Sequence, residues 1–169
     1  MPTAPSLLEV SNELTRRPKP SSPEALSRLC LDMNIRGHLC VLREPYVTFI
    51  LDGRKTIESR FQNTKALPFQ KVASGDILFL KRFGGSLRGL VLAGCTQYHG
   101  PMEDGEAETL LRKHRTALAI GESFISEKKN SKYASLLSIL DRTATDHIPC
   151  TKADERAWVV LVHRQSVRA

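Results

Sequence analysis

Lys55, Glu58 and Arg60 stand close together in the segment from Gly53 to Arg60. If this segment is a β-strand, alternate side chains share one face, so Glu58 and Arg60 lie on the same side. A guanidinium binds phosphate or carboxylate through two N–H groups, and a carboxylate accepts hydrogen bonds from the amino group of a base. Lys55 adds a compact third charge. The spacing predicts a polar cleft with two cations and one anion, suited to a nucleotide.

The same residue types allow two other interpretations. Glu58 is able to serve as a general base toward water, with Lys55 as an electrostatic helper, which would make the chain a metal-independent hydrolase. Alternatively, Lys55, Glu58 and Arg60 form a surface ion-pair cluster that only holds a strand and contributes little to stability. The residue types alone leave these alternatives open.

Further basic and aromatic residues could extend such a cleft. Lys81 and Arg82 follow the apolar run DILFL, and Tyr98 ends a later apolar segment. An aromatic ring that stacks on a base contributes about 1–3 kcal/mol to binding. The alternatives are solvated strand residues for the two cations and a structural rim position for Tyr98. Trp158 lies in an apolar strand, which is typical of a core residue.

Hydrophobic periodicity and turn residues predict the elements that position these side chains. Gly53 is predicted to end a helix in the left-handed conformation that favours glycine. Helices are expected over 6–17, 24–34, 46–53, 100–121 and 127–141, and strands over 38–43, 54–61, 76–83, 87–98 and 156–164.

Short strands, tight turns and few helices predict an α+β fold. We expect a small mixed β-barrel with an early helix and a helical insertion before the last strand. Residues 1–37 differ in pattern, because prolines interrupt the helical spacing there. They are predicted to form an N-terminal helical arm with a Pro-rich linker, followed by a domain over 38–169.

The segment from Gly53 to Arg60 resembles the G-x-K-x-x-E-x-R signature of the ASCH domain family. The preceding VLREPYVTFILDG, the later SGDILFL and the final WVV also resemble segments of that family, so the resemblance covers residues 38–164. It implies a PUA-like barrel and an RNA- or nucleotide-binding module with a role in RNA metabolism, translation or transcriptional coregulation. Its motif falls on Gly53, Lys55, Glu58 and Arg60, and with Lys81, Arg82 and Tyr98 from the residue patterns above these are the residues expected to bind the ligand.

The resemblance also implies an enzymatic alternative. Some small ASCH-type proteins remove an acyl group from a modified cytidine with a Lys, a Thr and a Glu. The Lys corresponds to Lys55, Glu58 stands in place of the Thr, and Glu122 is the candidate for the third residue. Cleavage of RNA is a related alternative, in which Lys55 and Arg60 hold the phosphate and Glu58 takes the 2′-hydroxyl proton.

Net charge and composition limit the classes of partner and cofactor that we expect. The 169 residues carry a formal charge of +7 and a pI near 9.5, which favours a polyanionic partner because Lys and Arg neutralise phosphates. The four cysteines are scattered, which predicts reduced thiols. No spacing typical of metal ligands and no cofactor motif occurs in the sequence, so we expect neither a metal nor a cofactor.

Targeting signals and membrane spans are also not expected. The N-terminus lacks the pattern of a secretory signal, and no apolar run is long enough to span a bilayer. We therefore expect an intracellular protein, cytoplasmic, or nuclear if eukaryotic. A third alternative is a protein-interaction adaptor, in which the segment LLEVSNEL of the N-terminal arm docks into a groove of a protein partner.

Overall fold

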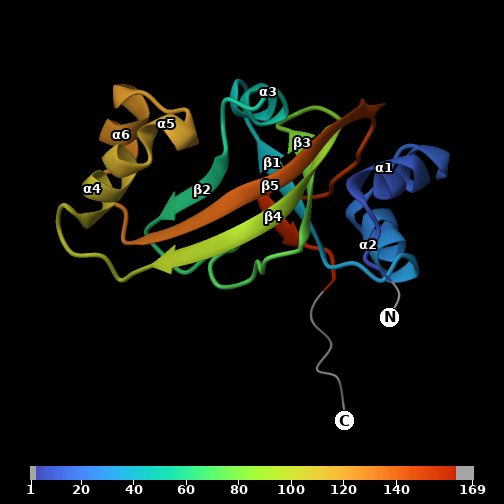
Figure 1. Cartoon of the computed structure of the whole chain (residues 1–169), viewed down its shortest axis with the longest axis horizontal. Helices are drawn as coiled ribbons and strands as arrows, with labels where there is room; N and C mark the ends of the chain where they lie inside the picture. Colours follow the sequence, from blue (N-terminus) through green and yellow to red (C-terminus); the bar gives the residue numbers. More distant parts are fainter. Residues whose placement is uncertain (1–2, 163–169) are drawn as a thin grey trace, which may run out of the picture.

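The computed structural model describes residues 3–162 and contains one curled sheet of six strands (Figure 1). The strand order is β2-β5-β4-β3-β1-β6, with β1 and β3 parallel and every other neighbouring pair antiparallel. The strands are β1 (Gly37–Leu42), β2 (Ile57–Gln62), β3 (Ile77–Arg82), β4 (Leu87–His99), β5 (Tyr133–Ile148) and β6 (Trp158–Val160). The curl makes a half-barrel with β2 and β6 at its two ends.

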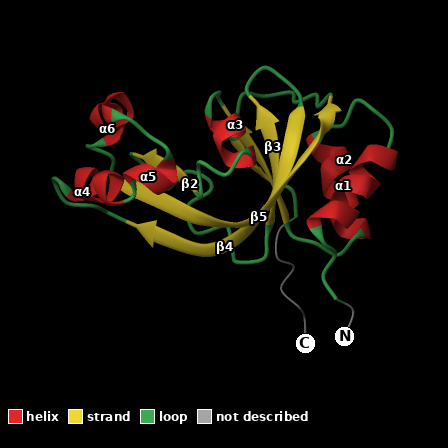
Figure 2. Cartoon of the chain, turned by 45° about the horizontal axis from the view of Figure 1, so that its top comes forward, coloured by secondary structure: helices red, strands yellow, loops and turns green. Residues whose placement is uncertain are grey.

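Helices lie at the two opposite ends of the molecule, with the sheet between them (Figure 2). They are α1 (Leu7–Arg16), α2 (Pro23–Asp32), α3 (Tyr46–Leu51), α4 (Glu106–Lys113), α5 (Arg115–Leu118) and α6 (Glu122–Lys128). The pair α1 and α2 covers one end, the group α4 to α6 covers the other, and α3 lies between them. The predicted α+β class with a small mixed β-barrel is confirmed, and the barrel takes the form of a curled half-barrel.

The turn after α3 positions the first residues of the charged segment. Gly53 has φ of +89°, the left-handed conformation predicted for it. Directly after it, the backbone N–H of Lys55 donates to the carbonyl of Phe49 at 2.9 Å, so the chain folds back against the end of the helix. The glycine therefore directs Lys55 into the body of the molecule.

The predicted helix over 127–141 is wrong. The helix α6 ends at Lys128, and Tyr133–Ile148 forms the longest strand, β5. The first half of β5 lies between β2 and β4, and four consecutive side chains there, residues 134–137, are buried. A strand buried on both faces reads as a continuous apolar run, which periodicity cannot separate from a buried helix. The helical insertion accordingly precedes β5, the penultimate strand.

Two other predicted elements are shorter than expected. The helix over 100–121 is divided into α4 and α5, because α4 begins only after Gly105 and the chain breaks helical geometry at His114. The final strand spans Trp158–Val160, and residues 163 and 164 of the predicted strand lie outside the described residues.

The N-terminal helices pack against the sheet. Leu7, Val10 and Leu14 of α1 are buried in the same apolar cluster as Leu39 and Phe79 of the strands. The apolar face of the arm is therefore covered by the chain's own core. A protein partner of the arm would have to contact its outer surface.

The structure also shows the state of the cysteines and the length of the helices. Cys30, Cys40, Cys95 and Cys150 form no disulfide bond in this structure. Within residues 3–162, every helix is too short or too polar to cross a bilayer.

Candidate nucleotide cleft

The charged segment lies where the two ends of the curled sheet approach each other. Arg60 belongs to β2 at one end, yet its Nη2 donates to the carbonyl of Val41 on β1 at 2.9 Å. Its guanidinium carbon also lies 5.3 Å from the ring centroid of Trp158 on β6, at the other end. At this position a side chain, rather than a backbone ladder, joins the two ends of the half-barrel.

Glu58 lies between the two cations. Its Oε1 accepts from Arg60 Nε at 3.2 Å, which confirms that both side chains share one face of the strand. Its Oε2 is 3.8 Å from Lys55 Nζ, which instead donates to the carbonyl of Leu118 at 2.9 Å. Glu58 is 2% exposed, and Oε2 has no hydrogen-bond donor among the described residues. A buried carboxylate oxygen without a donor is costly, so this atom is ready to accept one.

Burial changes the ionisation of two neighbouring groups. Burial lowers the pKa of Lys55, Arg60 adds to this effect, and Glu58 opposes it. Burial also raises the pKa of Cys40 to about 12, so this thiol is neutral at physiological pH. Lys55 is thus a cation whose proton is held less tightly than that of an exposed lysine.

A cleft of about 790 Å³ opens in front of this cluster. Lys55, Glu58 and Arg60 all line it, so the structure brings together the three residues predicted to form a polar cleft. Aromatic rings also line it: Tyr46 and Phe124 meet edge to face at 5.9 Å between centroids. The volume lies within the usual range for small-molecule sites, and the mixture of apolar walls and a few polar groups is typical of them.

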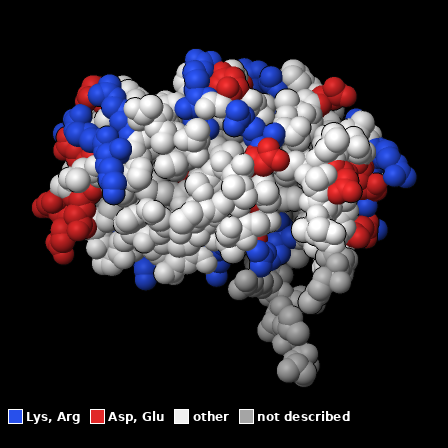
Figure 3. Space-filling model, in the orientation of Figure 1, with Lys and Arg blue, Asp and Glu red and all other residues white. Residues whose placement is uncertain are grey.

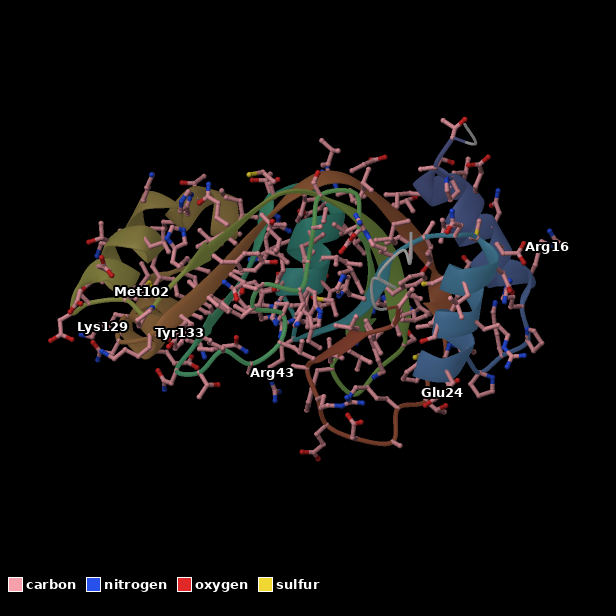
Figure 4. The ribbon with its side chains drawn as sticks, turned by 90° about the horizontal axis from the view of Figure 1, so that it is seen from below. Arg16, Glu24, Arg43, Met102, Lys129 and Tyr133 are labelled. Carbon is pink, nitrogen blue, oxygen red and sulfur yellow. The ribbon has the colours of Figure 1, made fainter. Side chains whose placement is uncertain are left out.

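The mouth of the cleft carries Arg43 and Phe83, which both line it. Figure 4 shows Arg43 at the edge of the molecule, between the end that holds Lys129 and the end that holds Glu24. The charged residues Glu127, Lys128 and Glu155 also line the cleft.

A buried polar chain supports the Trp158 ring behind Arg60. The indole Nε1–H donates to His38 Nδ1 at 3.2 Å, so the ring proton of His38 is on Nε2, which donates to Asp76 Oδ2 at 2.9 Å. Arg36 Nε donates to the other carboxylate oxygen at 2.6 Å. Burial acts to raise the pKa of Asp76, but hydrogen bonds from His38 and the Ala73 N–H outweigh it and lower that pKa. His38 and Trp158 therefore act as positioning residues for Arg60.

Four other predicted site residues lie outside the cleft lining. The Tyr98 hydroxyl accepts from the N–H of Val72 and donates to its carbonyl, the structural alternative considered for it. Lys81 is buried, and Arg82, the last residue of β3, is exposed. Gly53 contributes to the site only by forming the turn after α3 that directs Lys55 into the molecule.

The third proposed catalytic residue, Glu122, is also outside the cleft. Its carboxylate pairs with Arg112 at 3.0 Å and Arg115 at 2.7 Å on the surface of the helical end.

Several cleft residues were not predicted from the sequence, namely Arg43, Tyr46, Phe83, Phe124, Glu127, Lys128 and Glu155. They come from the α3 start, the β3–β4 turn, α6 and the loop before β6, which are far apart along the chain. One signal was present for Tyr46, because it begins a helix that ends at the charged segment. For Phe83 and Phe124 the sequence contains no comparable signal.

Residues 3–162 contain no group of three or more His, Cys, Asp or Glu side chains that could hold a metal ion. Figure 3 shows Lys and Arg side chains over the α4–α6 helices and over α3, whereas the surface over β4 and β5 between them carries few charges.

The chain was compared with known proteins. The ASCH domain model matches residues 41–141. A crystal structure of a serine-to-alanine variant of the ASCH protein from Zymomonas mobilis aligns with a TM-score of 0.52 and 16% identity, over 66% of this chain and 72% of that one. The unsubstituted Zymomonas mobilis protein aligns with a TM-score of 0.49 and 17% identity, over 64% of this chain and 69% of that one. No curated protein matches this chain. Because the family model covers more than half of the sequence, the chain belongs to the ASCH domain family.

Proposed function

We propose that this chain binds RNA or a nucleotide in the cleft in front of Lys55, Glu58 and Arg60. The observation that supports it best is the buried Glu58, a residue of the cleft lining whose Oε2 has no hydrogen-bond donor among residues 3–162. The exocyclic amino group of a base is such a donor. The aromatic rings of Tyr46 and Phe124 provide apolar walls for a planar base.

Family and charge agree with this proposal. ASCH domains are generally RNA-binding modules with a PUA-like fold. The formal charge of +7 favours association with a polyanion through counterion release. Arg60 presents its guanidinium to the cleft, where it is available to a phosphate or a base oxygen.

The test is the salt dependence of RNA affinity. Binding of a mixed-sequence single-stranded RNA is measured by fluorescence anisotropy at several salt concentrations, with the wild type and the double variant Lys55→Ala, Arg60→Ala. We expect a steep loss of affinity with salt in the wild type and a flatter dependence in the variant. The matched control is Arg16→Ala, Arg54→Ala, which removes two positive charges outside the cleft lining and should keep the wild-type affinity for RNA.

A second variant tests the cleft if the double variant does not fold. Glu58→Gln has nearly the same volume and keeps one acceptor, so it should fold and lose affinity only in part. An unchanged salt slope in a folded double variant, together with wild-type affinity of Glu58→Gln, would place RNA binding elsewhere on the molecule.

The hydrolase alternative is favoured by one observation, the lowered pKa of Lys55 beside the buried Glu58. Perturbed titratable pairs in clefts are common at catalytic centres. In this alternative Glu58 takes a proton from water or from a 2′-hydroxyl, and an amide cannot do so. Glu58→Gln would then abolish turnover of acylated cytidine or single-stranded RNA while keeping most of the affinity. No turnover by the wild type on either substrate would contradict it.

A further inference from the structure

Two residues at the cleft mouth are brought together by the parallel pairing of β1 and β3. Leu42 is the register partner of Arg82, and each of them ends its strand. Arg43 and Phe83 therefore leave the same edge of the sheet side by side. The N–H of Phe83 donates to the carbonyl of Leu42 at 2.7 Å and holds this arrangement.

Phe83 presents an aromatic surface to solvent. Its side chain is 51% exposed, and the Arg43 guanidinium carbon lies 3.8 Å from its ring centroid. The other large apolar side chains with high exposure, Leu8, Leu31 and Leu140, are aliphatic and lie outside the cleft lining. Phe83 is the aromatic member of this exposed set and the one that borders the candidate site.

Arg43 differs from the cations inside the cleft. Lys55 and Arg60 are both within 4 Å of the Glu58 carboxylate. Within residues 3–162, Arg43 forms no ion pair, and its side chain is exposed. Its charge is thus not neutralised by a carboxylate and is available to an anion at the mouth.

We propose that the Arg43–Phe83 pair is a stacking platform for a second base, next to the base held in the cleft. The proposal rests on the function proposed for the cleft. Where an RNA strand leaves the cleft, its next base meets the planar guanidinium of Arg43 and the phenyl ring of Phe83. Arg43 is then within reach of the phosphate that connects the two nucleotides. In a duplex the faces of the bases are covered by their neighbours, so this platform requires an unpaired strand. The ligand is therefore a single strand of at least two nucleotides.

The test compares a short ligand with a longer one. Affinities of the four nucleoside 5′-monophosphates and of a mixed-sequence single-stranded RNA hexamer are measured by calorimetry for the wild type, Phe83→Ala and Phe83→Trp. We expect Phe83→Ala to weaken hexamer binding by about 5- to 150-fold, the effect of losing one stacked base. Mononucleotide affinity should fall far less than hexamer affinity, and Phe83→Trp should keep hexamer affinity. Leu140→Ala, another exposed apolar residue, is the matched control and should change neither affinity.

Arg43 gives a second measurement. Arg43→Ala should reduce the slope of log affinity against log salt for the hexamer by about 0.7, the contribution of one phosphate on a single strand. Arg43→Lys should keep that slope but lose part of the affinity, because an ammonium does not stack on a phenyl ring as a guanidinium does.

Different failures have different meanings. An unchanged hexamer affinity in Phe83→Ala, or an equal loss for hexamer and mononucleotide, would overturn the platform and leave the cleft proposal intact. Tighter binding of a duplex than of the single strand would also overturn it. If the wild type binds no nucleotide of any length, the proposed function fails and the platform fails with it.

Discussion

Glu122 and Glu58 each lie between two cations, and their surroundings differ completely. Glu122, at the start of α6, pairs with Arg112 and Arg115, and its side chain is 58% exposed. Glu58 lies near Lys55 and Arg60 and is 2% exposed. Glu58 was a catalytic candidate from its residue type, and Glu122 was one from the family resemblance.

The difference between them is decided by burial. At the surface, the hydrogen bond from Arg112 is the main cause that lowers the pKa of Glu122, and water screens the pairs. In the cleft, charges removed from water must be compensated by neighbouring groups, and Glu58 Oε2 is left without a donor. The same residue types therefore form a surface ion-pair network in one place and a buried cluster with an unpartnered carboxylate oxygen in the other.

Removing each carboxylate should give the largest contrast. Glu58→Ala leaves Lys55 and Arg60 buried without their anion, and we expect it to lower the free energy of unfolding by about 3–5 kcal/mol. Glu122→Ala, the matched control, should leave the urea midpoint nearly unchanged. Equal effects of the two substitutions in urea unfolding would show that burial does not separate the two clusters.

The turn that directs Lys55 inward should give an intermediate effect. Gly53 has φ of +89°, and Gly53→Val would force a β-branched residue into that conformation at a cost of about 1–3 kcal/mol. A Cβ there would also meet the guanidinium of Arg142. Gly121→Ser is the control, because Gly121 has extended backbone angles and nothing near its Cβ position. Wild-type thermal stability of Gly53→Val would contradict the role given to this turn.

The smallest effect concerns pH. Because burial lowers the pKa of Lys55 from 10.5, the unfolded chain binds more protons than the folded chain between the lowered pKa and 10.5. The free energy of unfolding contributed by Lys55 therefore rises with pH in that interval. Lys55→Met should remove this rise when urea unfolding is measured at increasing pH up to 10.5.

A matched substitution isolates this contribution. Lys129→Met makes the same substitution at an exposed lysine. The stability of this variant should therefore follow the pH dependence of the wild type. If Lys55→Met and the wild type change in parallel with pH, Lys55 is not the cation that burial destabilises.

Sequence reasoning worked best where a local rule was sufficient. The left-handed Gly53, the α3 helix before it and the strand that places Glu58 beside Arg60 all follow from short-range geometry. It failed for β5, because a strand covered on both faces lacks the alternation that identifies strands. Burial by two neighbours is a property of the sheet, which periodicity within one segment cannot reveal.

The sequence by itself determined the family signature, the α+β class and the three charged residues at the centre of the candidate site. Only the tertiary structure decided that Glu58 is buried while Glu122 is not, and that Arg60 reaches Val41 and Trp158 across the curl of the sheet. It also placed Arg43 beside Phe83 at the mouth. The physical reason is that spacing specifies which side chains share a face of one element, whereas burial and the pairing of distant strands depend on how the elements pack.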